Sequence, residues 1–296
     1  MSRTWFNGAF MEGPLAIDRG ERGLLLGDGL FETMLALNRV ALWRNPHLLR
    51  MEQAAAALGI GFDRAHVDKA LDQVLADAPG PHQVLRVTLT RGSGLRGLAA
   101  AGGKPGLLVT CDPFDPALMF QPVTLATSTI RRNPFSLTSR HKTLSYIDSI
   151  AAAREAASRG CEDALMLNTD GHVASSSIAN LFLVKKHRFI TPGLNEAILA
   201  GITRQALIGA AAQRGFTVEE RIVTPGELAE ADAVFLTNSL RFIRPVTALD
   251  NTPLGRGDVQ AFTDALCAAA RLQCGHDPRL IWTEPEVKPA APEEGR

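Results

Sequence analysis

The chain has 296 residues, of which 46% are hydrophobic, and its 31 basic and 31 acidic side chains give a formal net charge of zero. This length exceeds the usual size of one domain, and the apolar content suffices for extended cores, which predicts two globular domains. A neutral balance gives no electrostatic reason to expect a nucleic acid or an anionic membrane as partner. Small-molecule chemistry is therefore the better expectation.

The order of the residues excludes further classes. No run of about 18 apolar residues is present, and the first ten residues lack the basic start, apolar stretch and cleavage site of a secretory signal. We therefore expect no membrane contact and a cytoplasmic location. The cysteines are widely spread and form no ligand cluster, so we expect neither a metal site nor a disulfide framework. They are Cys111, Cys161, Cys267 and Cys274.

The first 120 residues mix short apolar segments with two helical patterns, which is typical of an α/β domain. Apolar residues at helical spacing follow Asn45 and Pro46, which suit an N-cap and a first turn, and Gly59 ends the pattern. A second helix is predicted from His66 to Ala76, before a Pro-Gly turn. The predicted strands are Leu24 to Leu26, Thr33 to Leu37, Val84 to Thr90 and Leu107 to Thr110.

A proline-containing stretch from Pro113 to Pro122 separates this pattern from a second one, and we place the domain boundary near residue 120. Residues 121–275 again alternate strands and helices, which predicts a second α/β domain. The tail, residues 276–296, shows no periodicity and is expected to be flexible and to add nothing to a core. The predicted strands are Val123 to Ala126, Asp163 to Leu167, Asn180 to Val184, Val218 to Ile222 and Ala233 to Leu236, and the predicted helices are Ser145 to Arg159, Thr203 to Arg214 and Asp258 to Leu272.

One lysine lies where a loop enters a helix, in the sequence Ser139-Arg140-His141-Lys142-Thr143-Leu144. A lysine at such a place can be desolvated, which lowers its pKa and frees the amine to condense with an aldehyde. A loop lysine is more commonly a solvated surface charge, so its surroundings have to decide.

Two turns and one arginine supply what an anionic group needs. Gly201-Ile202-Thr203-Arg204 opens a helix, where free backbone N–H groups, a hydroxyl and the helix dipole favour a phosphate, although Thr203 could simply cap its helix. Thr237-Asn238-Ser239 forms a similar turn after an apolar strand. Arg50 lies beside small side chains on its helix and could reach a phosphate, or form a surface salt bridge instead. Together with Lys142 these are the parts of a pyridoxal 5′-phosphate (PLP) site.

With these parts the sequence resembles the class IV aminotransferases, of PLP fold type IV, which include branched-chain and D-amino-acid aminotransferases and aminodeoxychorismate lyase. The resemblance spans about residues 5 to 250 and implies two α/β domains with the cofactor between them. It is carried by Gly23-Leu24-Leu25-Leu26-Gly27-Asp28-Gly29-Leu30-Phe31-Glu32-Thr33, by His47-Leu48-Leu49-Arg50, and by the segment from Asp170-Gly171-His172-Val173 to Ser177-Ile178-Ala179-Asn180-Leu181-Phe182.

The resemblance implies a role for each matching residue. Lys142 becomes the lysine that holds PLP as a Schiff base and moves the proton during catalysis. The phosphate and the pyridine ring are implied to be bound by Arg50, Ile202, Thr203, Ser239, Ser175 and Asn180.

The sequence departs from the family at Ser175. Family members commonly place a glutamate five residues before the asparagine, where it pairs with the pyridine nitrogen, but no acid occurs here between Asp170 and Asn180. A carboxylate keeps the ring nitrogen protonated, whereas a serine hydroxyl can only form a hydrogen bond to it. We predict that Ser175 contacts this nitrogen and that the enzyme still turns over. The alternative is a PLP-binding protein without catalysis.

The substrate side of the site is also assigned by resemblance. The loop Thr90-Arg91-Gly92-Ser93-Gly94-Leu95-Arg96-Gly97 looks like the arginine-bearing loop of aminodeoxychorismate lyase and D-amino-acid aminotransferase. Arg96 is therefore implied to hold a substrate carboxylate, next to the partner subunit's active site in a homodimer; a flexible hairpin tip is the alternative. Arg241 or Arg244 could form a replacement clamp, with the other facing solvent. The remaining pocket residues are Phe31, which replaces a tyrosine of the D-amino-acid enzymes, Tyr146, Asn238 and Leu240.

The resemblance implies an aminotransferase that moves an amino group between an amino acid, of D- or branched-chain type, and a 2-oxo acid. The alternative is aminodeoxychorismate lyase, which would release 4-aminobenzoate and pyruvate without an acceptor. A nucleotide-binding dehydrogenase would depend on Gly27-Asp28-Gly29, but no third glycine follows at the required spacing.

Overall fold

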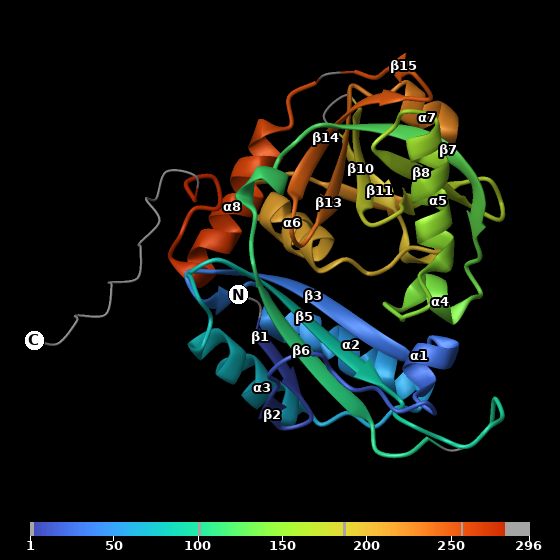
Figure 1. Cartoon of the computed structure of the whole chain (residues 1–296). Helices are drawn as coiled ribbons and strands as arrows, with labels where there is room; N and C mark the ends of the chain where they lie inside the picture. The colour runs from blue at the N-terminus through green and yellow to red at the C-terminus, as the bar shows by residue number, and fades with distance from the viewer. Residues whose placement is uncertain (1–2, 100–101, 186–187, 256, 282–296) are drawn as a thin grey trace, which may run out of the picture.

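The N-terminal part of the chain is an antiparallel sheet covered on one face by two helices (Figure 1). The computed structural model describes residues 3–99, 102–185, 188–255 and 257–281. In sheet order the strands are β2 (Ala9–Phe10), β1 (Arg3–Phe6), β6 (Gly106–Pro113), β5 (Gln83–Thr90), β3 (Gly29–Leu37) and β4 (Val40–Ala41). Buried and half-buried residues alternate along β5, so that one face packs against α2 (Arg44–Leu58) and α3 (Arg64–Ala76). Nearly all of β3 is buried, because its other face meets the second half of the molecule.

The predicted strand at Leu24 to Leu26 is wrong, because these residues end the short helix α1 (Arg22–Leu26). The Glu21 carboxylate accepts a hydrogen bond from the backbone N–H of Gly23, and Gly27 ends the helix with a φ of 65°. A run of three apolar residues carries too little periodicity to distinguish a strand from a helix.

Helix α2 begins one residue before the predicted cap. Trp43, with a φ of 50°, turns the chain into the helix, so that Asn45 lies inside the first turn, while the predicted end at Gly59 is confirmed. The other predicted strands and helices are present, with ends displaced by a few residues. Several short strands that pair at sheet edges or in hairpins were not predicted, because they carry no apolar alternation of their own.

The C-terminal part contains a nine-stranded mixed sheet (Figure 1). Its strands in order are β12 (Val218–Arg221), β11 (Arg188–Pro192), β10 (Asn180–Lys185), β13 (Ala233–Asn238), β14 (Phe242–Leu249), β7 (Val123–Arg132), β8 (Asp163–Asn168) and β9 (Val173–Ser176), with β15 (Thr252–Pro253) paired to β14. The helices and 3-10 turns of this part are η1 (Pro116–Leu118), α4 (Leu137–Arg140), α5 (Ile147–Ser158), η2 (Leu194–Glu196), α6 (Ile202–Gln213), α7 (Pro225–Ala229) and α8 (Gln260–Cys274). The fold is the mixed α/β arrangement that the resemblance implied.

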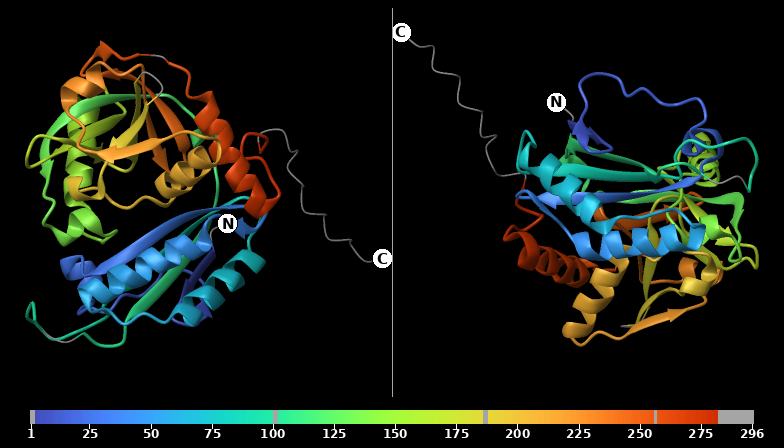
Figure 2. Two further views of the ribbon diagram at one scale, coloured as in Figure 1. Left: turned by 180° about the vertical axis from the view of Figure 1, so that it is seen from behind. Right: turned by 90° about the horizontal axis from the view of Figure 1, so that it is seen from below.

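The two halves share an apolar core at their junction. Leu35 and Leu37 of β3 pack in the same cluster as Phe182 and Phe235 of the large sheet and as residues of α8. Figure 2 shows α8 at this junction from two sides. The proposed domain boundary near residue 120 falls in the connection between β6 and β7. Because apolar side chains from both sides are buried there, the relative position of the two sheets is fixed by packing.

The start of the predicted tail contributes to the core, contrary to expectation. Ile281 is 5% exposed and belongs to the junction cluster. A single apolar residue in a polar segment gives no periodic signal, although it can still fill a gap. The rest of the predicted tail, residues 282–296, lies outside the described residues.

Two predicted absences concern membranes and metals. Among the described residues, no helix is both long and apolar enough to cross a bilayer. Within the same residues, no group of three or more potential ligand side chains gathers as a metal site would require. A cytoplasmic location stays a prediction.

Candidate active site

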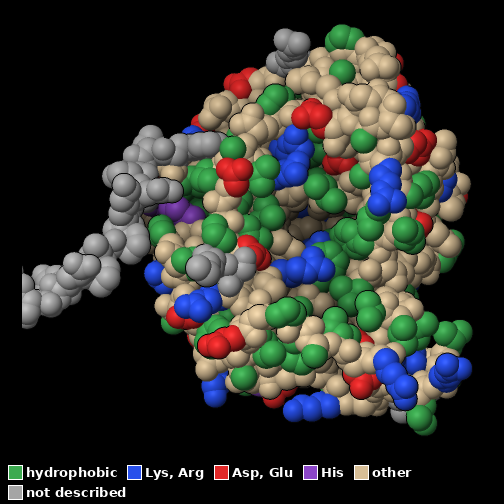
Figure 3. All heavy atoms as spheres, viewed as in Figure 1, with side chains coloured by type: hydrophobic (Ala, Val, Ile, Leu, Met, Phe, Trp, Pro, Cys, Tyr) green, Lys and Arg blue, Asp and Glu red, His purple; other side chains and the backbone are tan. Residues whose placement is uncertain are grey.

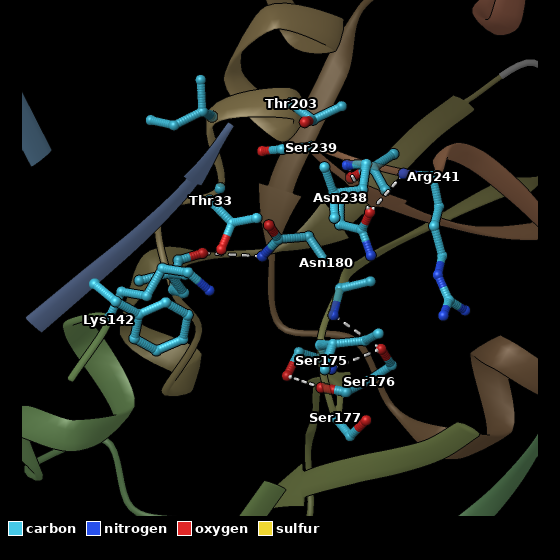
Figure 4. A pocket seen from close by; sticks show the side chains of 18 of the residues that line it. Thr33, Lys142, Ser175, Ser176, Ser177, Asn180, Thr203, Asn238, Ser239 and Arg241 are labelled. Atoms are coloured by element: carbon cyan, nitrogen blue, oxygen red, sulfur yellow. Dashed lines mark hydrogen bonds between the residues drawn. The ribbon is translucent and has the colours of Figure 1, made fainter. Parts of the chain in front are cut away.

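A cavity of about 370 Å³ opens between the two halves of the molecule. The surface view shows a hollow there with basic side chains beside it (Figure 3), and the close-up shows side chains from separate elements converging on one space (Figure 4). Twelve of the thirteen residues predicted for the site line this cavity, although they are spread over more than 200 positions of the chain. They are Phe31, Arg50, Lys142, Tyr146, Ser175, Asn180, Ile202, Thr203, Asn238, Ser239, Leu240 and Arg241.

The lysine loop is held against β3 by backbone hydrogen bonds. The N–H of Phe31 donates to the Lys142 carbonyl at 2.9 Å, and the N–H of Leu144 donates to the Gly29 carbonyl at 2.9 Å. The Lys142 Nζ donates to the Tyr146 hydroxyl at 3.1 Å and lies 4.2 Å from the centre of the Phe31 ring. The amine is thus half-buried between two aromatic rings and directed into the cavity. This placement suits an amine that attacks a carbonyl carbon.

The N-terminus of α6 presents unpaired donors to the cavity. Gly201 is the N-cap and no side chain caps the helix, so the alternative that Thr203 only serves as a cap is wrong. The hydroxyls of Thr203 and Thr237 are buried and have no hydrogen-bond partner among the described residues. A side chain at Gly201 would clash, since a Cβ there would lie 1.9 Å from the Asn180 Oδ1. Free N–H groups and two orphan hydroxyls favour an anion at this point.

Arg50 forms an ion pair and also lines the cavity. Its Nε and one terminal nitrogen donate to the Glu32 carboxylate at 2.8 and 2.6 Å, and the other donates to the Ala200 carbonyl at 2.7 Å. The ion pair is buried rather than on the surface, because Glu32 is 1% exposed. The guanidinium still lines the cavity, next to the N-terminus of α6.

Ser175 lies in β9 and lines the cavity. Its hydroxyl is buried and donates to the Ser176 carbonyl at 2.8 Å. Asn180 donates from its Nδ2 to the Leu199 carbonyl at 2.9 Å, which connects the start of β10 to the segment before α6. At this residue, where the resemblance implies a carboxylate, the cavity is thus lined by a neutral side chain.

Two arginines of the cavity were missed by sequence reasoning. The Arg86 guanidinium stacks 3.9 Å from the centre of the Phe31 ring, and Arg132 keeps its Nε without a partner among the described residues. Burial lowers the pKa of both guanidinium groups, which still remain cationic at neutral pH. The alternation along β5 could have placed Arg86 on the uncovered face of its sheet. With Arg50, Arg241 and Lys142 the cavity has five cationic side chains, and none of its described lining residues is acidic.

The three arginines that the sequence offered for binding a carboxylate differ in position. Arg241 lines the cavity, whereas Arg244 faces neither the cavity nor solvent. Its guanidinium is buried and donates to the carbonyls of Gln121 and Pro122 in the inter-domain connection, at 2.8 and 2.9 Å. Arg96 is exposed and does not line this cavity. Its predicted role would require a second copy of the chain.

Comparison with known proteins agrees with the geometry. The profile described as Amino-transferase class IV matches residues 29–249. The chain is 31% identical over 237 residues to the aminodeoxychorismate lyase of Vibrio harveyi, covering 78% of this chain and 86% of that protein. It is 27% identical over 259 residues to the D-alanine aminotransferase of Bacillus licheniformis, covering 86% and 91%. The crystal structure of the branched-chain aminotransferase of Thermoproteus uzoniensis with norvaline superposes with a TM-score of 0.84 at 26% identity, covering 95% and 97%. The match over most of the chain shows that it belongs to the class IV aminotransferase family.

Proposed function

We propose that the cavity is a PLP site where an amino group passes between an amino acid and a 2-oxo acid, and that Lys142 holds the cofactor and moves the proton. Class IV aminotransferases use PLP. The observation that carries the proposal is the shared cavity: the Lys142 amine and the unpaired donors of the α6 N-terminus open into the same space. A small molecule that carries an aldehyde and a phosphate could react with this amine and accept hydrogen bonds from these donors.

The residues present fit this cofactor. Its phosphate would accept hydrogen bonds from the α6 backbone at Ile202 and Thr203, from the hydroxyls of Thr203 and Ser239, and from Arg50. Its aldehyde end would lie at Lys142, and Asn180 would support the ring. The Thr203 hydroxyl is buried without a hydrogen-bond partner among the described residues, and a purely structural role for Thr203 would not explain this.

Lys142 would have two tasks. It would hold the cofactor covalently, and as a free amine its Nζ would carry a proton from the substrate α-carbon to the cofactor carbon that receives the amino group. When bound, PLP supplies an electron-withdrawing ring that makes this proton acidic. Tyr146, hydrogen-bonded to the Nζ, keeps the amine aimed at the reacting carbon.

The cationic lining indicates a substrate with carboxylate groups. Arg86 and Arg132 enter the cavity without acidic partners among the described residues, so each can pair with a substrate carboxylate. An amino acid and its 2-oxo acid both carry such a group. The relatives act on D-alanine or branched-chain amino acids by their names, and we propose a donor of D- or branched-chain type.

The function is tested with the holoenzyme and one substrate at a time. We expect an amino donor alone to convert the PLP absorbance to that of the aminated cofactor in a single turnover, and continuous turnover to require a 2-oxo acid. A panel of D- and L-amino acids, including aspartate and glutamate, identifies the donor. If no donor changes the absorbance, the aminotransferase proposal is wrong.

Aminodeoxychorismate lyase is the second candidate. It is favoured by the 31% identity to the Vibrio harveyi lyase, which is higher than the identity to the D-alanine enzyme. Its signature would be pyruvate released from aminodeoxychorismate without any acceptor. A PLP-binding protein without catalysis would show neither reaction.

Ser175 is proposed to contact the ring nitrogen. We expect Ser175→Glu to speed the donor half-reaction by about tenfold, or about 1.4 kcal/mol, because a carboxylate keeps the nitrogen protonated. Ser175→Ala should weaken PLP binding, since it removes one hydrogen bond. Stopped-flow absorbance measures the rate, and a PLP titration measures the affinity. Ser158→Ala, at an exposed position, is the control. Unchanged PLP affinity in Ser175→Ala would mean that another side chain meets the nitrogen.

We also propose a homodimer. Large apolar side chains are exposed on the surface, among them Leu25 of α1 and Ile147 of α5, which are 61% and 68% exposed. A second copy would cover them and could bring its Arg96 to this cavity. Sedimentation of the holoenzyme at the mass of a single chain would contradict this.

A further inference from the structure

A buried carboxylate and imidazole lie directly behind the proposed phosphate site. Glu32 of β3 and His47 of α2 are each 1% exposed, and neither lines the cavity. The His47 Nδ1 is 2.7 Å from a Glu32 oxygen, and its Nε2 is 3.4 Å from the hydroxyl of Ser239. Glu32 also holds Arg50. The pair therefore touches two residues of the proposed phosphate cup, one from each half of the molecule.

The protonation of this pair follows from its surroundings. Burial alone would raise the pKa of Glu32, but Arg50 and His47 outweigh it and lower the pKa to about 2. Burial lowers the pKa of His47, and Arg50 and Lys142 add to this, while Glu32 opposes it. Without a bound anion we therefore expect an ionised Glu32 and a neutral His47 at neutral pH.

The hydrogen-bond partners of His47 then determine its tautomer. A neutral imidazole has one N–H, and the ionised Glu32 can only accept, so the proton lies on Nδ1. The Nε2 is left as an acceptor and meets the hydroxyl proton of Ser239. The contact of 3.4 Å is at the long limit of a hydrogen bond, so the hydroxyl can turn away at little cost.

A dianionic phosphate changes this arrangement. Its oxygens only accept hydrogen bonds, so Ser239 must turn its hydroxyl proton toward the phosphate, which leaves the His47 Nε2 facing an oxygen lone pair. The negative charge also offsets Arg50, one of the cations that disfavour a charged His47. Both effects favour a proton on Nε2, which would then donate to the Ser239 oxygen.

We propose that Glu32 and His47 form a relay behind the phosphate cup, in which His47 takes up a proton from solvent when the cofactor phosphate binds. The groups that face His47 are Glu32 from β3, Arg50 from its own helix, Lys142 from the loop before α5 and Ser239 from the turn after β13. His47 and Glu32 are positioning residues, because they act through Ser239 and Arg50. This inference depends on the proposed phosphate site.

The test is calorimetry of pyridoxine 5′-phosphate binding to the apoprotein at pH 7.5, in buffers of different ionisation enthalpy. This ligand carries the phosphate but no aldehyde, so Lys142 forms no bond to it. We expect the wild type to take up more protons than His47→Asn, with a difference of up to about one proton per chain. Pyridoxine, which lacks the phosphate, should show no such difference.

A matched control uses another histidine that pairs with a carboxylate. The His172 Nδ1 is 3.0 Å from Glu196, and neither residue lines the cavity, so His172→Asn should keep the wild-type proton uptake. Equal uptake in the wild type and His47→Asn overturns the relay. If Arg50→Met binds the ligand as tightly as the wild type, the phosphate does not bind at Arg50 and the proposed phosphate site is wrong.

Nitrogen NMR of the histidine rings tests the proposal on the wild type, so the result does not depend on whether a variant folds. Addition of pyridoxine 5′-phosphate to the wild type should move the His47 Nε2 signal from the shift of an unprotonated nitrogen to that of a protonated one. A ring that stays neutral with the ligand bound would contradict the proposal.

Discussion

Lys142→Ala is expected to abolish amino transfer, with a loss of at least about 1000-fold in the donor half-reaction. The physical reason is that one amine both holds the cofactor and moves the proton, and positioned proton transfer by itself contributes about 100- to 10,000-fold. The structure offers no substitute, since the other cations of the cavity are guanidinium groups, which do not lose a proton at neutral pH. Steady-state assays and the absorbance of the bound cofactor measure the two functions separately.

A second substitution separates charge from reactivity. Lys142→Arg keeps a cation near the Phe31 ring but cannot condense with an aldehyde, so it should be as inactive as Lys142→Ala. Lys69→Ala, at an exposed position of α3, should retain full activity. Activity of Lys142→Ala within tenfold of the wild type would rule out the assigned role.

Arg50→Met is expected to weaken PLP binding and to destabilise the protein. Loss of one charged hydrogen bond to phosphate costs about 1.5–3 kcal/mol, which raises the Kd for PLP about 10- to 150-fold. The substitution also leaves Glu32 buried without its main partner, and breaking a buried ion pair in this way costs about 3–5 kcal/mol of unfolding free energy. A PLP titration and urea unfolding of the apoprotein measure these effects independently.

A matched arginine on the same helix provides the control. Arg44 of α2 pairs with Asp68 and Asp72 but does not line the cavity. These pairs are partly exposed, so Arg44→Met should cost about 1 kcal/mol or less and leave the Kd for PLP unchanged. If Arg44→Met and Arg50→Met behave alike, Arg50 has no special relation to the cofactor.

The Arg50–Glu32 pair also sets a pH dependence. The pKa of Glu32 is lowered from 4.5 to about 2 in the folded protein, so the pair contributes its full stability above pH 4.5 and loses it as the pH falls toward 2. In Arg50→Met the contribution of Arg50 is lost, so burial, which raises the pKa of Glu32, is opposed by His47 alone. The stability advantage of the wild type should therefore shrink at acid pH.

Many residues of the site could be predicted from the sequence. The segment around Lys142, the helix opening at Gly201 and the stretch ending in Arg50 each have a local pattern, and their combination matched one family. Local patterns also predicted the main helices, since capping residues and helical spacing act within one element. The strand predicted at Leu24 to Leu26 was wrong because three apolar residues fit a strand and a helix equally well.

The sequence alone determined which residue types are available: one lysine at a loop end, hydroxyl-rich turns, and a serine where the family resemblance implies a glutamate. Only the tertiary structure decided which charges meet. Arg86 and Arg132 come from different halves of the molecule and reach the cavity without an acidic partner in the described part of the chain, whereas the Arg244 guanidinium donates to backbone carbonyls. The Glu32–His47–Ser239 contact joins residues about 200 positions apart. Such contacts depend on how two sheets pack through a shared apolar core, and packing between distant elements leaves no periodic signal in a single sequence.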